Sequence, residues 1–113
     1  MPSLESALQE FRAIVGPAHV SVDTEARAAE QATFPTSAQV PAVVSPADRV
    51  EVQACVRAAN RHRVPIYPVS TGLNWGYGSR VPARDACVVL SLRRMDRILD
   101  FDDTRGYITL EPG

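Results

Sequence analysis

The feature that most restricts the fold is a strand-helix-strand pattern in residues 41–69. Two short apolar runs, 41–44 and 64–69, have the composition of strands. The segment between them opens with Ser45, Pro46 and Asp48, which supply an N-cap hydroxyl, a proline at the first helical position and a carboxylate in the first turn. A helix to about Arg61 is therefore expected. Strands joined by such a crossover run parallel, with a right-handed connection.

The expected helix has one apolar face and one charged face. The apolar positions follow the spacing of a buried stripe, and they are Val52, Cys55, Val56 and Ala59. The positions expected to face water are Arg49, Glu51, Arg57 and Arg61. His62 lies at the carboxyl end of the helix, where a cation complements the helix dipole, and we assign it that role rather than a catalytic one.

A glycine-rich loop, residues 70–79, follows the second strand of this unit. Gly72, Gly76 and Gly78 permit positive φ and close approach of the backbone to another group. Concave arrays of backbone N–H groups bind anions such as a pyrophosphate. Further donors around the turn are Ser70, Thr71, Asn74 and Ser79. Loops at the carboxyl ends of parallel strands bind ligands in open α/β sheets, so a cofactor with a diphosphate is the natural candidate.

The spacing of these glycines excludes the two commonest phosphate motifs. They run G-x-x-x-G-x-G, which is neither the G-x-G-x-x-G dinucleotide fingerprint nor the G-x-x-x-x-G-K-[ST] loop. Every basic residue of the chain is arginine, so a P-loop lysine is absent. On glycine spacing alone, a structural turn and an anion site remain equally open.

The rest of the chain predicts further elements around this unit. Residues 4–15 form an amphipathic helix capped by Ser3 and ended by Gly16 and Pro17. Asp23 begins a weaker helical signal that runs to Ala32, and residues 33–40 have the composition of a connection. Residues 86–90 are continuously apolar, as in a strand covered on both faces. Residues 97–101 and 107–110 flank a polar turn and predict a hairpin.

Composition sets limits on function. A chain of 113 residues with a net charge of −1 suits one small domain and gives no basic patch for nucleic acid. Cys55 and Cys87 lack the spacing of a metal or redox motif and are expected to be buried free thiols. The aspartates of residues 100–103 read as a solvated turn, so no metal is expected. Since neither a signal peptide nor a long apolar run is present, we expect a cytoplasmic protein without a membrane.

Residues 70–79, Ser-Thr-Gly-Leu-Asn-Trp-Gly-Tyr-Gly-Ser, resemble the pyrophosphate-binding loop of flavoproteins of the vanillyl-alcohol oxidase and 4-cresol dehydrogenase family. The resemblance covers residues 41–113. It includes the Ser-Pro of residues 45–46, the segment 91–95 and the Glu-Pro-Gly of residues 111–113. It implies an α+β fold of the PCMH FAD-binding type, with an N-terminal helical segment, 1–40, before the first part of the FAD-binding domain, 41–113. The cofactor implied is FAD.

The resemblance also assigns functional residues. Tyr77 matches a tyrosine that hydrogen-bonds the phenolic oxygen of the substrate in phenol-oxidising members, which makes it the candidate catalytic residue. The implied substrate is a para-substituted phenol or a related alcohol, and the implied partner is an electron-acceptor protein or a second copy of the chain. The positions assigned to FAD are Ser70, Thr71, Gly72, Leu73, Asn74, Trp75, Gly76, Tyr77, Gly78, Ser79, Met95, Glu111, Pro112 and Gly113.

Two departures from the family pattern matter. Leu73 stands where members that attach flavin through this loop have a histidine, so that linkage is excluded. The chain also stops within a motif that continues in the family, and we interpret it as an amino-terminal fragment of a longer oxidoreductase. Two alternatives remain, a remnant or interaction module that keeps the fold without the cofactor, and an unrelated nucleotide-binding α/β domain.

Overall fold

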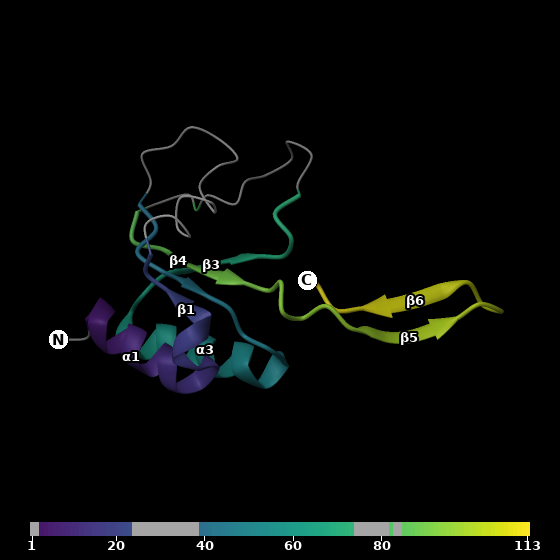
Figure 1. Cartoon of the computed structure of the whole chain (residues 1–113), viewed down its shortest axis with the longest axis horizontal. Coiled ribbons are helices and arrows are strands. Elements are labelled where there is room, and N and C mark those ends of the chain that lie inside the picture. Colours follow the sequence, from purple (N-terminus) through teal and green to yellow (C-terminus); the bar gives the residue numbers. More distant parts are fainter. Residues whose placement is uncertain (1–2, 24–38, 74–81, 83–84) are drawn as a thin grey trace.

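The computed structural model describes residues 3–23, 39–73, 82 and 85–113. Within these residues it shows two α-helices, a mixed sheet and a separate antiparallel hairpin, which confirms the expected α+β class (Figure 1). The described elements, in chain order, are α1 (Leu4–Val15), the 3-10 turn η1 (Pro17–His19), β1 (Val20–Ser21), β2 (Val43–Val44), α3 (Arg49–His62), β3 (Ile66–Val69), β4 (Val88–Ser91), β5 (Ile98–Asp102) and β6 (Tyr107–Leu110).

The main sheet has the strand order β1-β2-β4-β3. β4 is parallel to both neighbours, with Val43 opposite Val89 and Ile66 opposite Val88. The two strands joined by α3 therefore run parallel, as expected, but they do not pair directly with each other, because β4 lies between them. The reason is burial. All four residues of β4 are buried, and a strand this apolar is most stable in the centre of the sheet.

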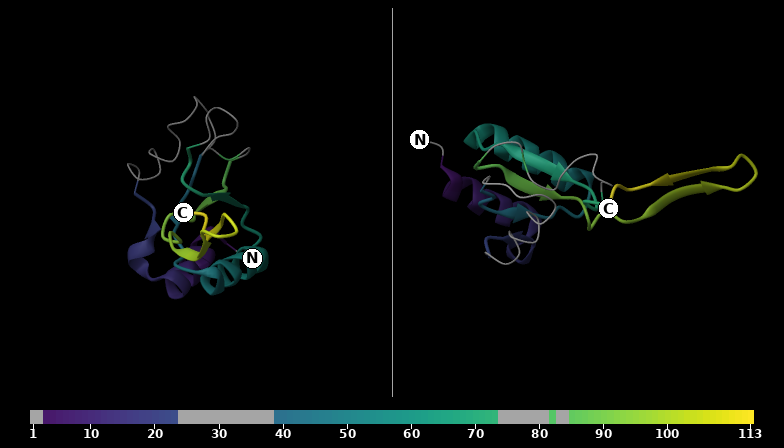
Figure 2. Two further views of the ribbon diagram at one scale, coloured as in Figure 1. Left: turned by 90° about the vertical axis from the view of Figure 1, so that its right-hand side faces the viewer. Right: turned by 90° about the horizontal axis from the view of Figure 1, so that it is seen from above.

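Both helices lie side by side on one face of the sheet (Figures 1 and 2). Phe11 of α1 is fully buried with Cys55 of α3 and Val44 and Val88 of the sheet, in one core that also includes Val20 of β1. The described part of the first forty residues therefore shares its core with the rest of the chain. At the rim of this interface, Glu10 of α1 accepts hydrogen bonds from the last two residues of α3, Arg61 and His62, the latter at 2.6 Å.

The start of α3 differs from the expectation. The N-cap is Asp48, whose Oδ1 accepts from the Glu51 N–H at 2.8 Å, while Glu51 Oε2 accepts from the Ala47 N–H at 2.6 Å. Ser45 does not cap the helix; its N–H donates to the His19 carbonyl at 2.9 Å, which continues the β1–β2 pairing to residue 45. The helix consequently begins at residue 49, three residues after Pro46.

This later start is accompanied by a different buried face of α3. The fully buried positions are Cys55, Ala58 and Ala59, spaced i, i+3, i+4. Val56, expected inside, has 39% of its surface exposed, and Val52 is only partly buried. Glu51 is half-buried because its carboxylate serves the helix start, whereas Arg49, Arg57 and Arg61 are exposed as expected.

The opposite face of the sheet carries a second, smaller apolar cluster. Val40, Val43, Val69 and Val89 are buried there, with Tyr67 packed against them. β4 therefore contributes buried side chains to both faces, Val88 and Leu90 to the helical side and Val89 to the other. This confirms the prediction of a strand covered on both sides. Cys55 and Cys87 are both buried and unbridged, as expected.

The hairpin β5–β6 extends away from the helices and the main sheet (Figures 1 and 2). Phe101 pairs with Ile108 and Ile98 with Leu110, with a register shift between Ile98 and Asp100. Since cross-strand partners point to the same face, one side of the hairpin is apolar. The other side is polar, with the pairs Asp100–Thr109 and Asp102–Tyr107. Ile98, Phe101, Ile108 and Leu110 remain about half to two thirds exposed.

Candidate functional site

Three segments that are distant in sequence meet at the carboxyl ends of β3 and β4. Residues 70–73 follow β3, residues 92–95 follow β4, and residues 111–113 return from the hairpin. We call these eleven residues the cofactor corner. The first two segments are joined where the Leu92 N–H donates to the Val69 carbonyl at 2.8 Å. The parallel strands β3 and β4 thus deliver both loops to one edge of the sheet, which is where open α/β sheets bind ligands.

The first segment begins the glycine loop. Gly72 has φ 77°, which confirms the positive φ expected at this position, and its backbone is buried while Thr71 and Leu73 are exposed. The turn is held from outside by Arg93, whose guanidinium donates to the Thr71 carbonyl at 3.2 Å. Thr71 Oγ1 also accepts a long hydrogen bond from the Leu73 N–H, 3.4 Å. The loop therefore leaves β3 with a tight turn fixed by residues of two segments.

The second and third segments are in closer contact still. The turn after β4 closes with a hydrogen bond from the Met95 N–H to the Leu92 carbonyl, 3.0 Å, and the Gly113 N–H donates to the Met95 carbonyl at 2.7 Å. A Cβ at position 113 would lie 2.2 Å from the Leu92 carbonyl oxygen. Only glycine fits there. The Ser70 hydroxyl, in turn, donates to the Pro112 carbonyl, which links the third segment to the first.

An ion pair holds the third segment at the base of the hairpin. The Glu111 carboxylate accepts from Arg97 Nη2 at 2.8 Å, Nε at 3.2 Å and the backbone N–H at 3.0 Å. The Glu111 N–H completes the contact by donating to the Arg97 carbonyl at 2.9 Å. The side-chain hydrogen bond from Arg97 is the main cause that lowers the pKa of Glu111, and the same bond raises the pKa of Arg97. Only 8% of the Glu111 side chain is exposed.

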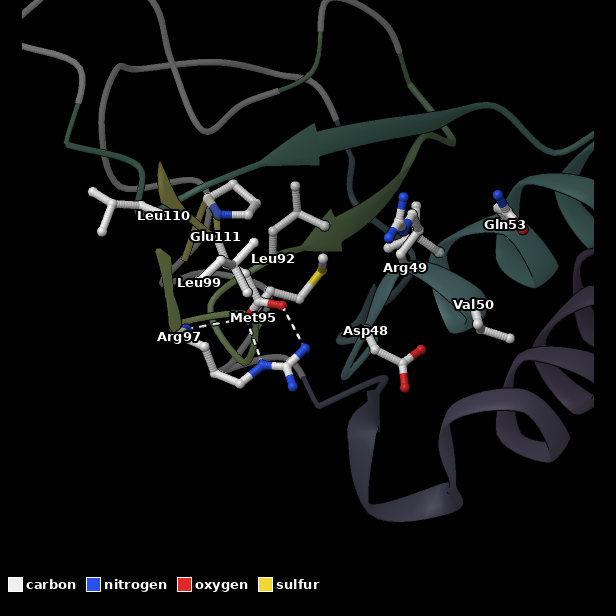
Figure 3. Close-up of a pocket in the computed structure, with 12 residues that line it drawn as sticks. Asp48, Arg49, Val50, Gln53, Leu92, Met95, Arg97, Leu99, Leu110 and Glu111 are labelled. Atoms are coloured by element: carbon white, nitrogen blue, oxygen red, sulfur yellow. Dashed lines mark hydrogen bonds and ion pairs between the residues drawn. The ribbon is translucent and has the colours of Figure 1, made fainter. Parts of the chain in front are cut away.

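A pocket of about 600 Å³ opens beside the cofactor corner, between the first turns of α3 and the base of the hairpin (Figure 3). The corner contributes Leu92, Met95, Glu111 and Pro112 to its wall. The other apolar residues are Val50, Val52, Leu99 and Leu110. The other polar residues that line it are Asp48, Arg49, Gln53 and Arg97. An apolar hollow with a few polar groups is the usual form of a small-molecule site.

The structure brings together eight of the fourteen positions assigned to FAD from the sequence. They are Ser70, Thr71, Gly72, Leu73, Met95, Glu111, Pro112 and Gly113. The other six, among them the candidate catalytic residue, lie outside the described residues, and they are Asn74, Trp75, Gly76, Tyr77, Gly78 and Ser79.

The sequence analysis missed the residues that position this corner. Arg93 and Arg97 hold Thr71 and Glu111, and neither arginine was singled out from the sequence. For Arg97 a signal existed, because Ile98 pairs with Leu110 and residues 97 and 111 are therefore the next pair outward in the hairpin. For Arg93 no local pattern indicates the contact, since it depends on the parallel pairing of β3 with β4.

Other site types find no support in the described part of the chain. Residues 3–23, 39–73, 82 and 85–113 contain no cluster of three side chains suited to a metal ion. Asp102 instead stabilises the hairpin turn by accepting from the Arg105 N–H at 2.9 Å. Burial raises the pKa of the Cys55 thiol to about 11, with a smaller contribution from Glu51, so this thiol is protonated at neutral pH. Among the same residues, no helix is long and apolar enough to span a bilayer.

Comparison with known proteins identifies the family. Residues 40–113 match the family model described as FAD binding domain. The chain is 60% identical over 111 residues to a 1'-carboxy-chondrochloren decarboxylase of Chondromyces crocatus, covering 97% of the chain and 20% of that protein. It is 36% identical to the 4-cresol dehydrogenase [hydroxylating] flavoprotein subunit of Pseudomonas putida, covering 95% of the chain and 21% of the subunit.

Solved structures agree. The fold matches p-cresol methylhydroxylase with a TM-score of 0.89 at 33% identity, covering 96% of the chain and 22% of that structure. It matches the 4-ethylphenol oxidase of Gulosibacter chungangensis with a TM-score of 0.90 at 34% identity, covering 98% of the chain and 23% of that structure. The chain thus spans about a fifth of the length of the relatives it matches.

The cofactor corner fits the cofactor of these proteins. Gly72 takes the positive φ that lets a loop present its N–H groups, and Gly113 leaves room where any side chain would clash. Both glycines lie in loops that meet at the carboxyl ends of β3 and β4, and Met95 and Pro112, next to Gly113, line the pocket. This chain belongs to the FAD-binding domain family of PCMH type, and the cofactor of that family is FAD.

Proposed function

We propose that the chain forms the FAD-binding part of an oxidoreductase that removes a hydride from a para-substituted phenol or a related alcohol. The observation that carries this proposal is the meeting of residues 70–73, 92–95 and 111–113 at one edge of the sheet, in a chain 33–36% identical to proteins named for cresol and ethylphenol oxidation. FAD, when bound, accepts the two electrons of a hydride. The role of the chain is to bind and orient that cofactor.

Tyr77 is the proposed catalytic residue, by its match to the family. Oxidation of a para-alkylphenol breaks a C–H bond on the carbon next to the ring, and the electron pair leaves with the hydrogen as hydride. The phenolic proton is lost, and a quinone methide results. A hydrogen-bond donor aimed at the phenolic oxygen stabilises the anion that favours this step. The competing interpretation is that Tyr77 only packs beside Trp75.

A second candidate is favoured by one comparison. The chain is 60% identical, over almost its whole length, to a protein named as a decarboxylase, which is far above its identity to the cresol enzyme. A substrate bearing a carboxyl group, which is lost as carbon dioxide at the same flavin site, is therefore the alternative chemistry. The described corner fits both candidates, because it concerns the cofactor and not the substrate.

The proposed partners follow from the relatives. One of them is named as a flavoprotein subunit, which supports a second protein that accepts electrons from the reduced cofactor. The net charge of −1 gives no reason to expect nucleic acid. The remaining alternative is a chain that keeps the fold without cofactor, and it predicts no flavin in any complete protein built with these residues.

A chimera tests the proposal. The segment of the Chondromyces crocatus relative that aligns with this chain is replaced by the chain, and the purified protein is examined for flavin absorbance and for turnover of a para-alkylphenol and of the relative's carboxylated substrate. We expect bound flavin. A folded chimera without flavin contradicts the proposal, and the substrate that turns over distinguishes the two chemistries.

Within a chimera that turns over the phenol, Tyr77→Phe tests the catalytic residue. The variant keeps the ring and deletes the donor, so flavin content stays normal while turnover falls by about 10²-fold or more, the scale seen when one oxyanion donor is removed. Unchanged turnover would assign Tyr77 to packing.

A further inference from the structure

The Glu-Pro-Gly segment, residues 111–113, reaches the cofactor corner from an element with little packing of its own. β6 is exposed along its whole length, and β5 is exposed up to half-buried Asp102. A two-stranded hairpin of this kind is marginal in water without further support. The contacts at its base therefore decide where residues 112 and 113 lie relative to the main sheet.

We infer that Arg97 and Glu111 are positioning residues for the cofactor corner, which act by holding the backbone of residues 112 and 113 and not by touching FAD. The inference rests on the proposed binding of FAD at this corner. It changes the role of Glu111, which the family resemblance assigns to the lining of the cofactor.

The geometry of the carboxylate supports a positioning role. Both oxygens are engaged, Oε1 by Arg97 Nη2 and Oε2 by Arg97 Nε and the Arg97 N–H, so three of about four acceptor positions are used. Figure 3 shows the Arg97 side chain folded back onto this carboxylate. With 8% of its side chain exposed, Glu111 has little surface to offer a ligand. Bidentate arginine–carboxylate pairs combine strength with a fixed geometry.

The pair is connected to the glycine loop through a short series of contacts. The two residues after Glu111 make one contact each. The Pro112 carbonyl accepts a hydrogen bond from the Ser70 hydroxyl, and the Gly113 N–H donates to the Met95 carbonyl. Ser70 is the residue before Thr71, where the loop turns. Release of the ion pair is expected to loosen the third segment first and then the loop that depends on it.

Amide NMR on the intact 113-residue chain tests the inference with two independent readouts. The first is hydrogen exchange of the Gly113 N–H without ligand, and the second is the apparent affinity for added FAD, followed by chemical shifts of residues 70–73. The variants are Glu111→Ala, Arg97→Ala and the double variant, with Glu111→Gln as a milder change. The control is Asp102→Ala, which removes the other ion pair of the hairpin, with Arg105 at 3.8 Å.

We expect each single variant to accelerate Gly113 exchange by about 10-fold or more, the scale of a lost charge-assisted contact, and to weaken FAD binding in parallel. The double variant should be no worse than Glu111→Ala, because Arg97→Ala removes two of the three hydrogen bonds that Glu111→Ala removes and leaves the one from the Arg97 backbone N–H. The Gly113 exchange rate and the FAD affinity of Glu111→Gln should lie between those of Glu111→Ala and those of the unaltered chain. The control should change neither readout.

The outcomes separate the inference from the proposed function. FAD affinity lost in Glu111→Ala but kept in Arg97→Ala, with Gly113 exchange unchanged in both, would make Glu111 a direct ligand and overturn the inference. Unchanged exchange and affinity in every variant would overturn it as well. If the unaltered chain shows no response to FAD while exchange still depends on the pair, the proposed function fails at this corner and the positioning of residues 112 and 113 stands.

Discussion

The tightest contact in the cofactor corner lies at Gly113, and Gly113→Ala tests whether the corner is assembled as described. An added Cβ would lie 2.2 Å from the Leu92 carbonyl oxygen, 2.7 Å from that of Met95 and 2.8 Å from that of Arg93. All three are backbone atoms of one closed turn. To reach ordinary van der Waals distance, the segment must move by about 1 Å or more.

Two responses compete, and their costs are of similar size. Forcing the methyl group into the turn costs about 1–3 kcal/mol, as in other overpacked sites. Releasing the segment forfeits the hydrogen bond from the Gly113 N–H to the Met95 carbonyl and the contact between Ser70 and Pro112, each worth about 1 kcal/mol. The turn cannot widen without losing the hydrogen bond that closes it, from the Met95 N–H to the Leu92 carbonyl. We therefore expect the Gly113 segment to move out of the turn, which lowers the free energy of unfolding by about 1–2 kcal/mol.

Gly106→Ala is the matched control. Gly106 has φ 74° and nothing within 4 Å of an added Cβ, so alanine there costs about 1–2 kcal/mol of backbone strain without any clash. Both variants should therefore lower the midpoint of thermal unfolding by several degrees. They differ in amide exchange at position 113, which becomes fast in Gly113→Ala and stays protected in Gly106→Ala. A protected amide in Gly113→Ala, together with unchanged stability, would refute the described packing of the corner.

Three further predictions concern the two cysteines, the pH dependence due to Glu111 and the hairpin. Thiol reagents at neutral pH should modify neither Cys55 nor Cys87 until the chain unfolds, because both are buried, and rapid native labelling of Cys55 would contradict its raised pKa. Glu111 has a lowered pKa in the fold, so its contribution to stability is complete above the ordinary pKa of a glutamate and is lost as the pH falls through the lower folded pKa. The midpoint of thermal unfolding should therefore fall as the pH is lowered through the folded pKa of Glu111, and Glu111→Gln should remove the part of this fall that Glu111 causes. The apolar face of the hairpin should cause self-association, which sedimentation would show to be reduced by Phe101→Asp and not by Thr109→Asp on the polar face; equal behaviour of the two variants would argue against this face.

Local chemistry made much of this fold predictable. Ser3 caps α1 as expected, its hydroxyl oxygen accepting from the Ser6 N–H at 3.2 Å, and Gly16 ends the helix with φ 90°. The unbroken apolar run before Ser91 correctly indicated a doubly covered strand. The polar residues 102–106 correctly indicated the turn of a hairpin.

What sequence reasoning missed depends on pairing between distant segments. Ser45 has every local feature of an N-cap, but residue 45 continues the β1–β2 pairing through its hydrogen bond to the His19 carbonyl, and the helix starts later, with Asp48 as its cap. The same holds for strand order, because a strand-helix-strand pattern cannot show that a later strand enters between the two. At the corner, the glycines at 72 and 113 were visible in the sequence. The arginines that hold the segments depend on strand register and loop convergence, which only the assembled fold defines.

The most direct test of the account is a comparison of FAD with riboflavin as ligands of the isolated chain, followed by amide chemical shifts. We predict weak, saturable binding of FAD, because a ligand enclosed on one side keeps most of its contact with water. Shifts should concentrate at residues 70–73, Met95 and Gly113, and riboflavin, which lacks the diphosphate, should cause far smaller ones. Equal shifts with both ligands, or FAD shifts that avoid these residues, would contradict the assignment of the corner to the cofactor.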